Sequence, residues 1–322
     1  MSSGFFDNFK IKHNVQFEKI CKMKQHELKN HLKQRLNMQS GDGWLFKEGT
    51  FPVLLTAHMD TVHKEQCKEI NYFKTQDKTV INSPVGIGGD DRCGIYMILR
   101  ILEKVNCSVL FCEDEEIGSV GAKKFVKTDL CESLKGKFKY IIELDRMNDK
   151  DAVFYEDANE DFHKFVTEEF WKESWGSWSD ICTLSPALEI SSVNLSCGYY
   201  NQHTTKEYVV LEEMERSITE TIKLLNRTDV NADPFKFEEQ TYGLHNYSLY
   251  DYSWYDDYSY SHQVSAKSSL IEDDDEPMYL EVTTLDNKYY VTAGTSIEEC
   301  WMNLFMENPE LCYGELIDYY FY

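Results

Sequence analysis

The chain has 322 residues, 42% of them hydrophobic, so it can bury a full-sized core in one large domain or two unequal ones. Its formal net charge of -23 argues against a nucleic-acid partner, because such binding depends on clustered Lys and Arg that face phosphates. The acidity is concentrated late in the chain. Residues 228–322 hold 20 acidic and three basic side chains, whereas residues 1–227 hold 36 and 30.

The N-terminal residues and the cysteines predict a cytoplasmic location. Residues 1–16 lack the long apolar run of a secretory signal, and no apolar run approaches the roughly 18 residues of a membrane span. The ten cysteines include no CxxC pair, which is typical of reduced, mostly buried thiols rather than a disulfide framework. We therefore expect a cytosolic protein that makes no membrane contact.

Hydrophobic spacing predicts alternating helices and strands in the first two thirds of the chain. Residues 15–38 have apolar side chains at helical spacing, and residues 53–57 form a short buried-strand pattern. Ile95, Ile98, Leu99 and Leu102 fall at i, i+3, i+4 and i+7, which predicts an amphipathic helix.

The same alternation continues to about residue 225. Strands are expected at 109–112, 140–144 and 190–195, with helices at 120–126 and 211–225. Such alternation predicts an α/β fold: a three-layer αβα sandwich around a mostly parallel mixed sheet. Sites in these sheets lie just beyond the carboxyl ends of the strands.

Composition divides the chain into three parts. Residues 1–233 are the expected catalytic domain. Residues 234–277 are an acidic, Tyr-rich linker, with seven tyrosines between positions 241 and 262. Residues 278–322 are expected to form a small ββα unit, because two strand patterns precede a capping box of Ser296 and Glu299.

Five short segments supply acidic and histidine side chains close to predicted strand ends or a helix start. Clustered carboxylates repel one another and resist desolvation unless cations neutralise them. Two histidines, three carboxylates and one spare glutamate are what two divalent metals and a general base require. The segments are His58-Met59-Asp60, Gly89-Asp90-Asp91, Asp114-Glu115-Glu116, Leu144-Asp145 and His203.

These segments resemble those of co-catalytic zinc peptidases, the superfamily that includes peptidase T, carboxypeptidase G type enzymes and zinc aminopeptidases. The resemblance spans roughly residues 20–225 and is carried by three sequence words in the family's order: Thr56–Val62, Asp114–Ser119 and Asn201–Glu207. It implies that His58 is a metal ligand and that Asp60 orients it through the far ring nitrogen.

The resemblance also implies the remaining roles. Asp90 would bridge the metals, since its distance to Gly94 favours it over Asp91. One metal would take His58, Asp145 and Asp90, and the other Glu116, His203 and Asp90. Glu115 would act as the general base and later protonate the leaving amine. Two Zn²⁺ ions are expected from the mixed His and carboxylate set, with Mn²⁺ or Co²⁺ left open.

Other roles stay open for several of these residues. Asp90 or Asp91 could cap a helix. Glu115 and Glu116 could belong to a solvated acidic loop, and Asp145 could pair with Arg146. Glu207 could close a capping box with Thr204 or act in the site. Three tryptophans could wall a substrate pocket, although core packing would account for at least one of them: Trp171, Trp175 and Trp178.

The implied reaction is amide hydrolysis in short peptides, by an aminopeptidase or dipeptidase. Only 58 positions separate Asp145 from His203, too few for the lid domain that the peptidase T and carboxypeptidase G branch inserts there. An N-acyl amino acid deacylase is the first alternative. The second is a non-catalytic, metal-stabilised binding protein that uses its acidic tail. Contact of that tail with a second copy or a protein partner stays open.

Overall fold

The computed structural model describes residues 15–74, 78–240, 278–284, 289–294 and 316–321. The chain forms two compact units, Met1–Thr241 and Tyr242–Tyr322.

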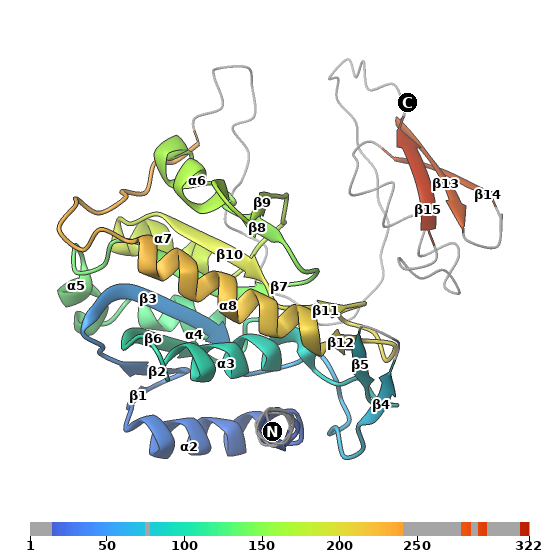
Figure 1. Cartoon of the computed structure of the whole chain (residues 1–322), viewed down its shortest axis with the longest axis horizontal. Coiled ribbons are helices and arrows are strands. Elements are labelled where there is room, and N and C mark those ends of the chain that lie inside the picture. Colours follow the sequence, from blue (N-terminus) through green and yellow to red (C-terminus); the bar gives the residue numbers. More distant parts are fainter. Residues whose placement is uncertain (1–14, 75–77, 241–277, 285–288, 295–315, 322) are drawn as a thin grey trace, which may run out of the picture. The chain divides into compact units, whose positions relative to one another are not determined.

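An eight-stranded mixed sheet forms the centre of the first unit (Figure 1). Its order is β1-β2-β6-β3-β7-β10-β8-β9, and the four central strands β6, β3, β7 and β10 run parallel. The strands are β1 (Gln39–Gly41), β2 (Trp44–Lys47), β3 (Phe51–His58), β6 (Cys107–Cys112), β7 (Ile141–Arg146), β8 (Asp151–Val153), β9 (Lys172–Glu173) and β10 (Ser192–Ser196).

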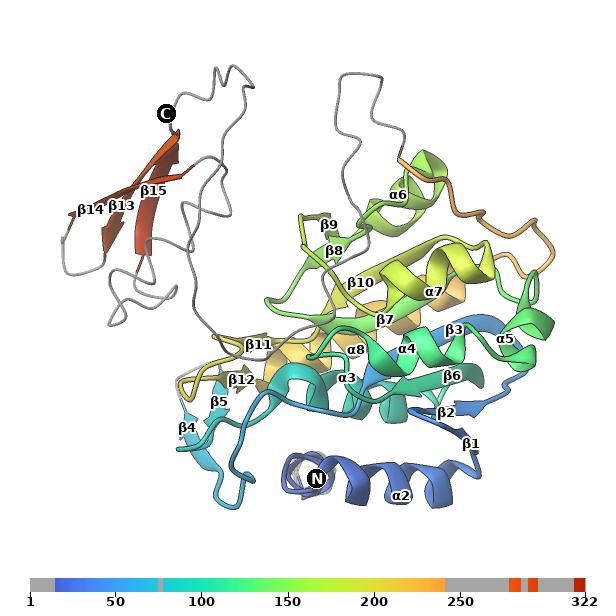
Figure 2. The ribbon, with the colours of Figure 1, turned by 180° about the vertical axis from the view of Figure 1, so that it is seen from behind.

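Helices cover both faces of this sheet, as predicted (Figures 1 and 2). Alternate side chains of each central strand face opposite ways, so Leu55 and Ile142 join one core and Leu54 and Ile141 the other. The first core includes α2 (Gln25–Leu36), α3 (Gly89–Ile101), α6 (Glu160–Thr167) and α8 (Leu211–Arg227); the second includes α4 (Val120–Phe125), α5 (Asp129–Leu134) and α7 (Ile181–Leu188).

Helix α3 is buried on nearly all sides, so the prediction of an amphipathic helix was wrong in this respect. The sheet covers one side and α8 another, and the N-terminal segment adds Phe17, whose ring lies 5.2 Å from that of Tyr96. That segment also differs from the single predicted helix. Residues 15–21 are helical, and α2 begins separately where the Glu27 carboxylate accepts the Lys24 backbone N–H.

A second, four-stranded antiparallel sheet lies beside the start of α3 (Figure 1) and was not predicted. Its order is β11-β12-β5-β4. The hairpin between β11 and β12 carries His203. The strands are β4 (Asn71–Lys74), β5 (Thr79–Asn82), β11 (Tyr199–Tyr200) and β12 (Tyr208–Val210).

The second unit contains a three-stranded antiparallel sheet in the order β14-β13-β15. The hairpin of β13 (Met278–Thr284) and β14 (Tyr289–Gly294) agrees with the sequence analysis, whereas β15 (Leu316–Phe321) was not predicted. The helix predicted after Ser296 lies outside the described residues.

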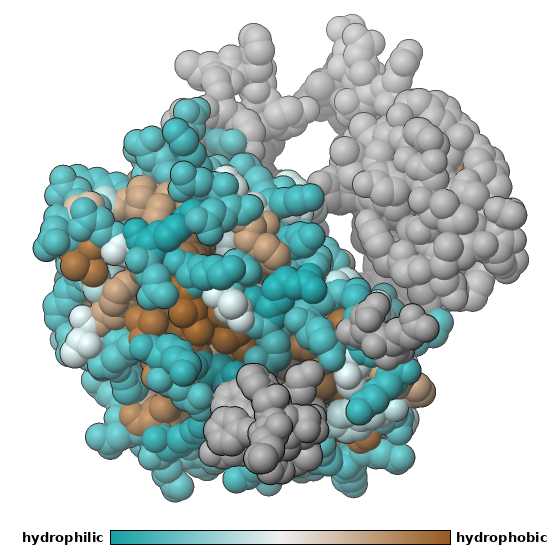
Figure 3. All heavy atoms as spheres, in the orientation of Figure 1, coloured by the Kyte–Doolittle hydropathy of each residue, from teal (hydrophilic) through white to brown (hydrophobic). Residues whose placement is uncertain are grey.

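Hydrophilic residues dominate the periphery of the face shown in Figure 3, and apolar residues gather near its middle. Among the described residues, no helix combines the length and apolar character needed to cross a membrane. The eight cysteines in the described part of the chain are unpaired, and all but Cys182 are buried.

Gly94 marks the closest approach of α3 to β7. A Cβ there would lie 1.7 Å from the Leu144 carbonyl oxygen and 2.5 Å from Asp91 Oδ1. Gly94→Ala should therefore lower the free energy of unfolding by about 1–3 kcal/mol, measured by urea denaturation. Gly136→Asn is the control, because the space around Gly136 is open and Asn tolerates its φ of +71°. Equal midpoints for Gly94→Ala and the wild type would contradict this packing.

Candidate metal centre

The segments singled out in the sequence meet at one edge of the central sheet. His58 ends β3, Glu115 and Glu116 follow β6, and Asp145 lies near the end of β7. Because these strands are parallel, their carboxyl ends share an edge, and Asp90 reaches it from the start of α3. His203 approaches from the β11–β12 hairpin.

The Asp90 carboxylate lies between the two histidines. Its Oδ1 is 2.9 Å from His58 Nε2, and its Oδ2 is 3.2 Å from His203 Nε2. His203 Nε2 is also 3.1 Å from Glu116 Oε2, and His58 Nε2 is 3.5 Å from Asp145 Oδ1. These contacts place His58 near Asp90 and Asp145, and His203 near Asp90 and Glu116. The sets whose ligand atoms all lie within 4.8 Å of one another are His58, Asp90 and Glu116, and His58, Asp91 and Asp145.

Asp60 connects the two sides of the site. Its Oδ1 is 3.2 Å from His58 Nδ1, and its two oxygens accept the backbone N–H groups of Glu115 and Glu116 at 3.0 and 3.1 Å. One buried carboxylate therefore orients the imidazole and also fixes the turn that carries both glutamates.

That turn brings both glutamates to the site, although adjacent side chains on a regular strand would point in opposite directions. Asp114 has a φ of +60° and Gly118 a φ of +104°, and the Gly118 N–H donates to the Glu115 carbonyl at 2.8 Å. Both glutamates line one pocket with Asp90 and Asp145. They do not form a solvated loop, since the Glu116 side chain is 8% exposed.

Asp91 has a different environment from Asp90. It is fully buried, and its carboxylate accepts the backbone N–H groups of Gly94 at 2.8 Å and His58 at 3.2 Å. Asp90 and Asp91 have non-helical backbone angles at a kink inside α3, and the Gly94 contact is that of an N-cap for the part of the helix after this kink, the role that the sequence left open between the two aspartates. Asp91 also lies within 4.8 Å of ligand atoms of His58 and Asp145, so it borders the site.

Asp145 is held by neighbours other than Arg146. Tyr199 Oη donates to Asp145 Oδ1 at 3.3 Å, and Ser179 Oγ to Oδ2 at 3.2 Å. Arg146 pairs instead with Asp151, its Nε lying 3.3 Å from Asp151 Oδ2. The structure therefore does not support a pair between Asp145 and Arg146.

The crowding of carboxylates changes their proton affinities. Burial raises the pKa of Glu115 to about 9 and that of Asp145 to about 7, with neighbouring carboxylates adding to both shifts. Hydrogen bonds to Asp90 and Glu116 raise the pKa of His203 to about 11. Burial opposes charge on His58, but Asp145, Asp60 and Asp90 together outweigh it and raise its pKa. These shifts reflect the concentration of carboxylates in the site.

Glu207 fixes the backbone at Gly88 and Asp90, a role that the sequence left undecided. Its buried carboxylate accepts the backbone N–H groups of Gly88 at 2.7 Å and Asp90 at 3.1 Å, and lies 2.8 Å from His63 Nε2. The side chain thus stabilises the loop before α3 rather than a capping box with Thr204. The glycine-rich run before Asp90 was the available sequence signal, because it is buried and its backbone N–H groups need acceptors.

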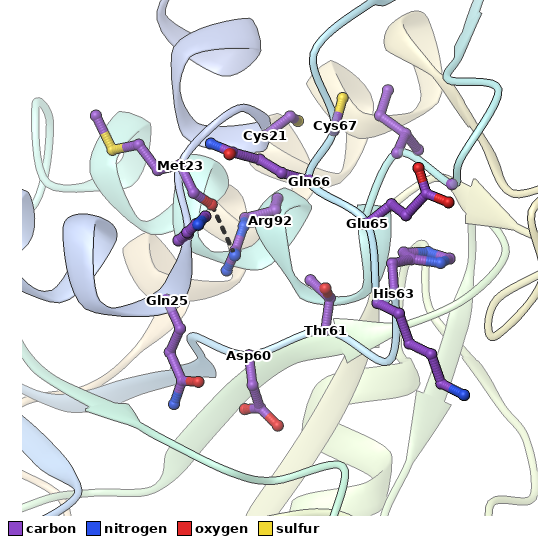
Figure 4. A pocket seen from close by; sticks show the side chains of 15 residues that line it. Cys21, Met23, Gln25, Asp60, Thr61, His63, Glu65, Gln66, Cys67 and Arg92 are labelled. Carbon is purple, nitrogen blue, oxygen red and sulfur yellow. Dashed lines mark hydrogen bonds between the residues drawn. The ribbon is translucent and has the colours of Figure 1, made fainter.

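A pocket of about 350 Å³ lies behind the loop after β3 (Figure 4). Buried Arg92 extends into it, donates to the Met23 carbonyl at 3.2 Å, and also donates to the Met59 carbonyl. Arg92 thus connects the segment that follows His58 and carries Asp60 to the N-terminal segment.

The metal-ligand candidates other than the buried His58 line a separate pocket of about 300 Å³. Of the three tryptophans, only Trp178 contributes to it, held by a hydrogen bond from Nε1 to Ser119 Oγ at 3.0 Å. Trp171 is 3% exposed and belongs to the core, and Trp175 is 70% exposed. The pocket is lined by Asp90, Glu115, Glu116, Gly118, Asp145, Arg146, Met147, Tyr155, Gly176, Ser177, Trp178, Tyr199, Gln202 and His203.

Neither the protein-family models nor the curated proteins include a match to this sequence. Solved structures do match. The aminopeptidase PepT from Bacillus cereus superposes with a TM-score of 0.51 at 15% identity, over 66% of this chain and 97% of that one. A tripeptidase from Staphylococcus aureus gives 0.50 at 14%, over 66% and 96%. The Pyrococcus horikoshii TET1 peptidase, which can assemble into a tetrahedron or a large octahedral shell, gives 0.50 at 12%, over 67% and 98%. These likenesses confirm the predicted peptidase-like α/β fold.

Proposed function

We propose that this protein is a two-metal hydrolase that cleaves amide bonds in short peptides, as an aminopeptidase or dipeptidase. The main support is the position of the Asp90 carboxylate, whose two oxygens face two different histidines. The structural neighbours include an aminopeptidase and a tripeptidase, which agrees with this reaction class.

The residues present fit a pair of divalent cations. Glu116 Oε1 is buried and has no hydrogen-bond partner among the described residues, an arrangement that a cation would stabilise. His58, Asp145 and Asp90 would hold one ion, and Glu116, His203 and Asp90 the other. Mixed imidazole and carboxylate ligands favour Zn²⁺, although Mn²⁺ and Co²⁺ accept the same donors.

Bound cations supply two kinds of chemistry here: they acidify water and polarise the scissile carbonyl. Glu115 is the group that moves the proton, from the attacking water to the leaving amine. Its pKa of about 9 reflects burial and the surrounding negative charge. Positive charge in the site would lower that pKa, so that Glu115 is ionised at neutral pH and able to accept a proton.

A substrate panel tests the reaction class. Aminoacyl amides and short peptides are compared with N-acyl amino acids, using protein saturated with Zn²⁺. Release of amine from the first group is expected. Turnover of N-acyl amino acids alone would reject the peptidase assignment in favour of a deacylase. Retention of metal without turnover of either group would favour a binding protein.

Metal content should depend on His203. We expect two equivalents of divalent metal in the wild-type protein and about one in His203→Ala, because that substitution removes a donor from only one of the two groups. Elemental mass spectrometry of protein purified under metal-replete conditions measures this. His26→Ala, an exposed histidine on α2, is the matched control and should keep two equivalents. Equal metal content in both variants would exclude His203 as a ligand.

Loss of the Glu115 carboxylate should stop turnover without removing metal. Glu115→Gln is expected to lower kcat by a factor of about 10²–10⁴, the usual contribution of a positioned general base. Glu113→Gln is the control, because Glu113 belongs to the same acidic run but pairs with Lys29. A Glu115→Gln variant as active as the control would remove Glu115 from its assigned role.

A further inference from the structure

Arg146 is the only Lys or Arg among the described residues that line the candidate active-site pocket. Asp90, Glu115, Glu116 and Asp145 contribute carboxylates to the same pocket. A fixed positive charge so close to this cluster is not required to hold metals. It therefore needs an explanation of its own.

An irregularity in β7 directs Arg146 into the pocket. Glu143 pairs with Asn194 of β10, and Arg146 pairs with Ser196, so two residues of β7 oppose one residue of β10. Side chains on a regular strand alternate between the two faces, and an extra residue breaks that alternation and re-aims a side chain. Asp145 and Arg146, although adjacent, consequently line the same pocket.

The guanidinium of Arg146 is held in place on one side only. Its Nε lies 3.3 Å from Asp151 Oδ2, and that oxygen also accepts Asn148 Nδ2 at 2.9 Å. The Asp151 backbone N–H donates to Ser196 Oγ at 2.8 Å. No acceptor among the described residues lies within hydrogen-bond distance of the two terminal nitrogens of Arg146. These two terminal nitrogens, which can pair with both oxygens of a carboxylate, are thus available at the pocket.

We propose that Arg146 binds a carboxylate of the substrate, so that the enzyme prefers short substrates with a free carboxylate near the scissile amide. This inference rests on the proposed function. Two divalent cations would offset the four acidic side chains of the cluster, leaving the charge of Arg146 to attract an anionic substrate group. The C-terminal carboxylate of a dipeptide or an acidic side chain could supply that group.

Three substrates distinguish a C-terminal carboxylate from an acidic side chain: leucyl-leucine, leucyl-leucine amide and aspartyl-leucine amide. Values of kcat/KM are measured for wild type, Arg146→Gln and Arg146→Lys, all loaded with Zn²⁺. Arg146→Gln should reduce kcat/KM for leucyl-leucine more than for its amide, by a factor of about 10–100, as expected for a lost charge-assisted hydrogen bond. Arg146→Lys should restore part of this preference. A loss confined to aspartyl-leucine amide would support the same site and assign it to an acidic side chain.

Arg216→Gln is the matched control, because Arg216 pairs with Asp149 outside this pocket and its loss changes the net charge equally. It should leave the preference unchanged. An equal reduction for all three substrates in Arg146→Gln, together with a lower Tm, would overturn the proposal and make Arg146 a structural partner of Asp151.

The proposed function and this inference can fail separately. If no substrate is hydrolysed, the reaction assignment fails, but calorimetry with leucyl-leucine and its amide still tests the carboxylate site. Wild type should then bind leucyl-leucine more tightly than the amide, and Arg146→Gln should lose that difference. Equal affinities of wild type for the two ligands would overturn the inference.

Discussion

The position of the Asp90 carboxylate between two histidines is the interaction on which the candidate site depends. Each of its oxygens contacts a different imidazole. Each imidazole also lies close to a second carboxylate, Asp145 at His58 and Glu116 at His203. Such a cluster is stable only if positive charge balances it. The carboxylates raise the pKa values of both histidines, and burial together with neighbouring carboxylates raises those of Glu115 and Asp145.

A second set of buried acids holds the cluster in place. Asp60, Asp91 and Glu207 accept backbone N–H groups from the segments that carry Glu115, His58 and Asp90 respectively. These bonds fix the backbone from which the candidate ligand side chains extend. Two apolar cores, one on each face of the sheet, pack against the strands that end at this edge. Stability and chemistry are thus assigned to different parts of the fold.

Local pattern was sufficient to predict the parts of the site that lie at strand ends. His58 and Glu115 follow apolar runs directly, and parallel strands bring such ends together. His203 could be assigned only through the family resemblance, because its hairpin belongs to a second sheet whose short strands, such as β11 with two residues, leave almost no periodic signal. The N-cap role of Asp91 and the break before α2 depend on single hydrogen bonds. The strand β15 is a long-range pairing that local pattern cannot reveal.

The bulge in β7 determines which side of the strand Arg146 occupies. A regular strand would place Arg146 on the face opposite Asp145, where it could serve only the core or the far side of the sheet. One extra residue opposite β10 brings a permanent cation and a metal-ligand candidate to the same pocket. The guanidinium of Arg146 must still lie apart from the carboxylate cluster, because an ion pair between Arg146 and Asp145 would compete with a metal for Asp145. Asp151 pairs with the Nε side of the guanidinium and so holds it apart from Asp145.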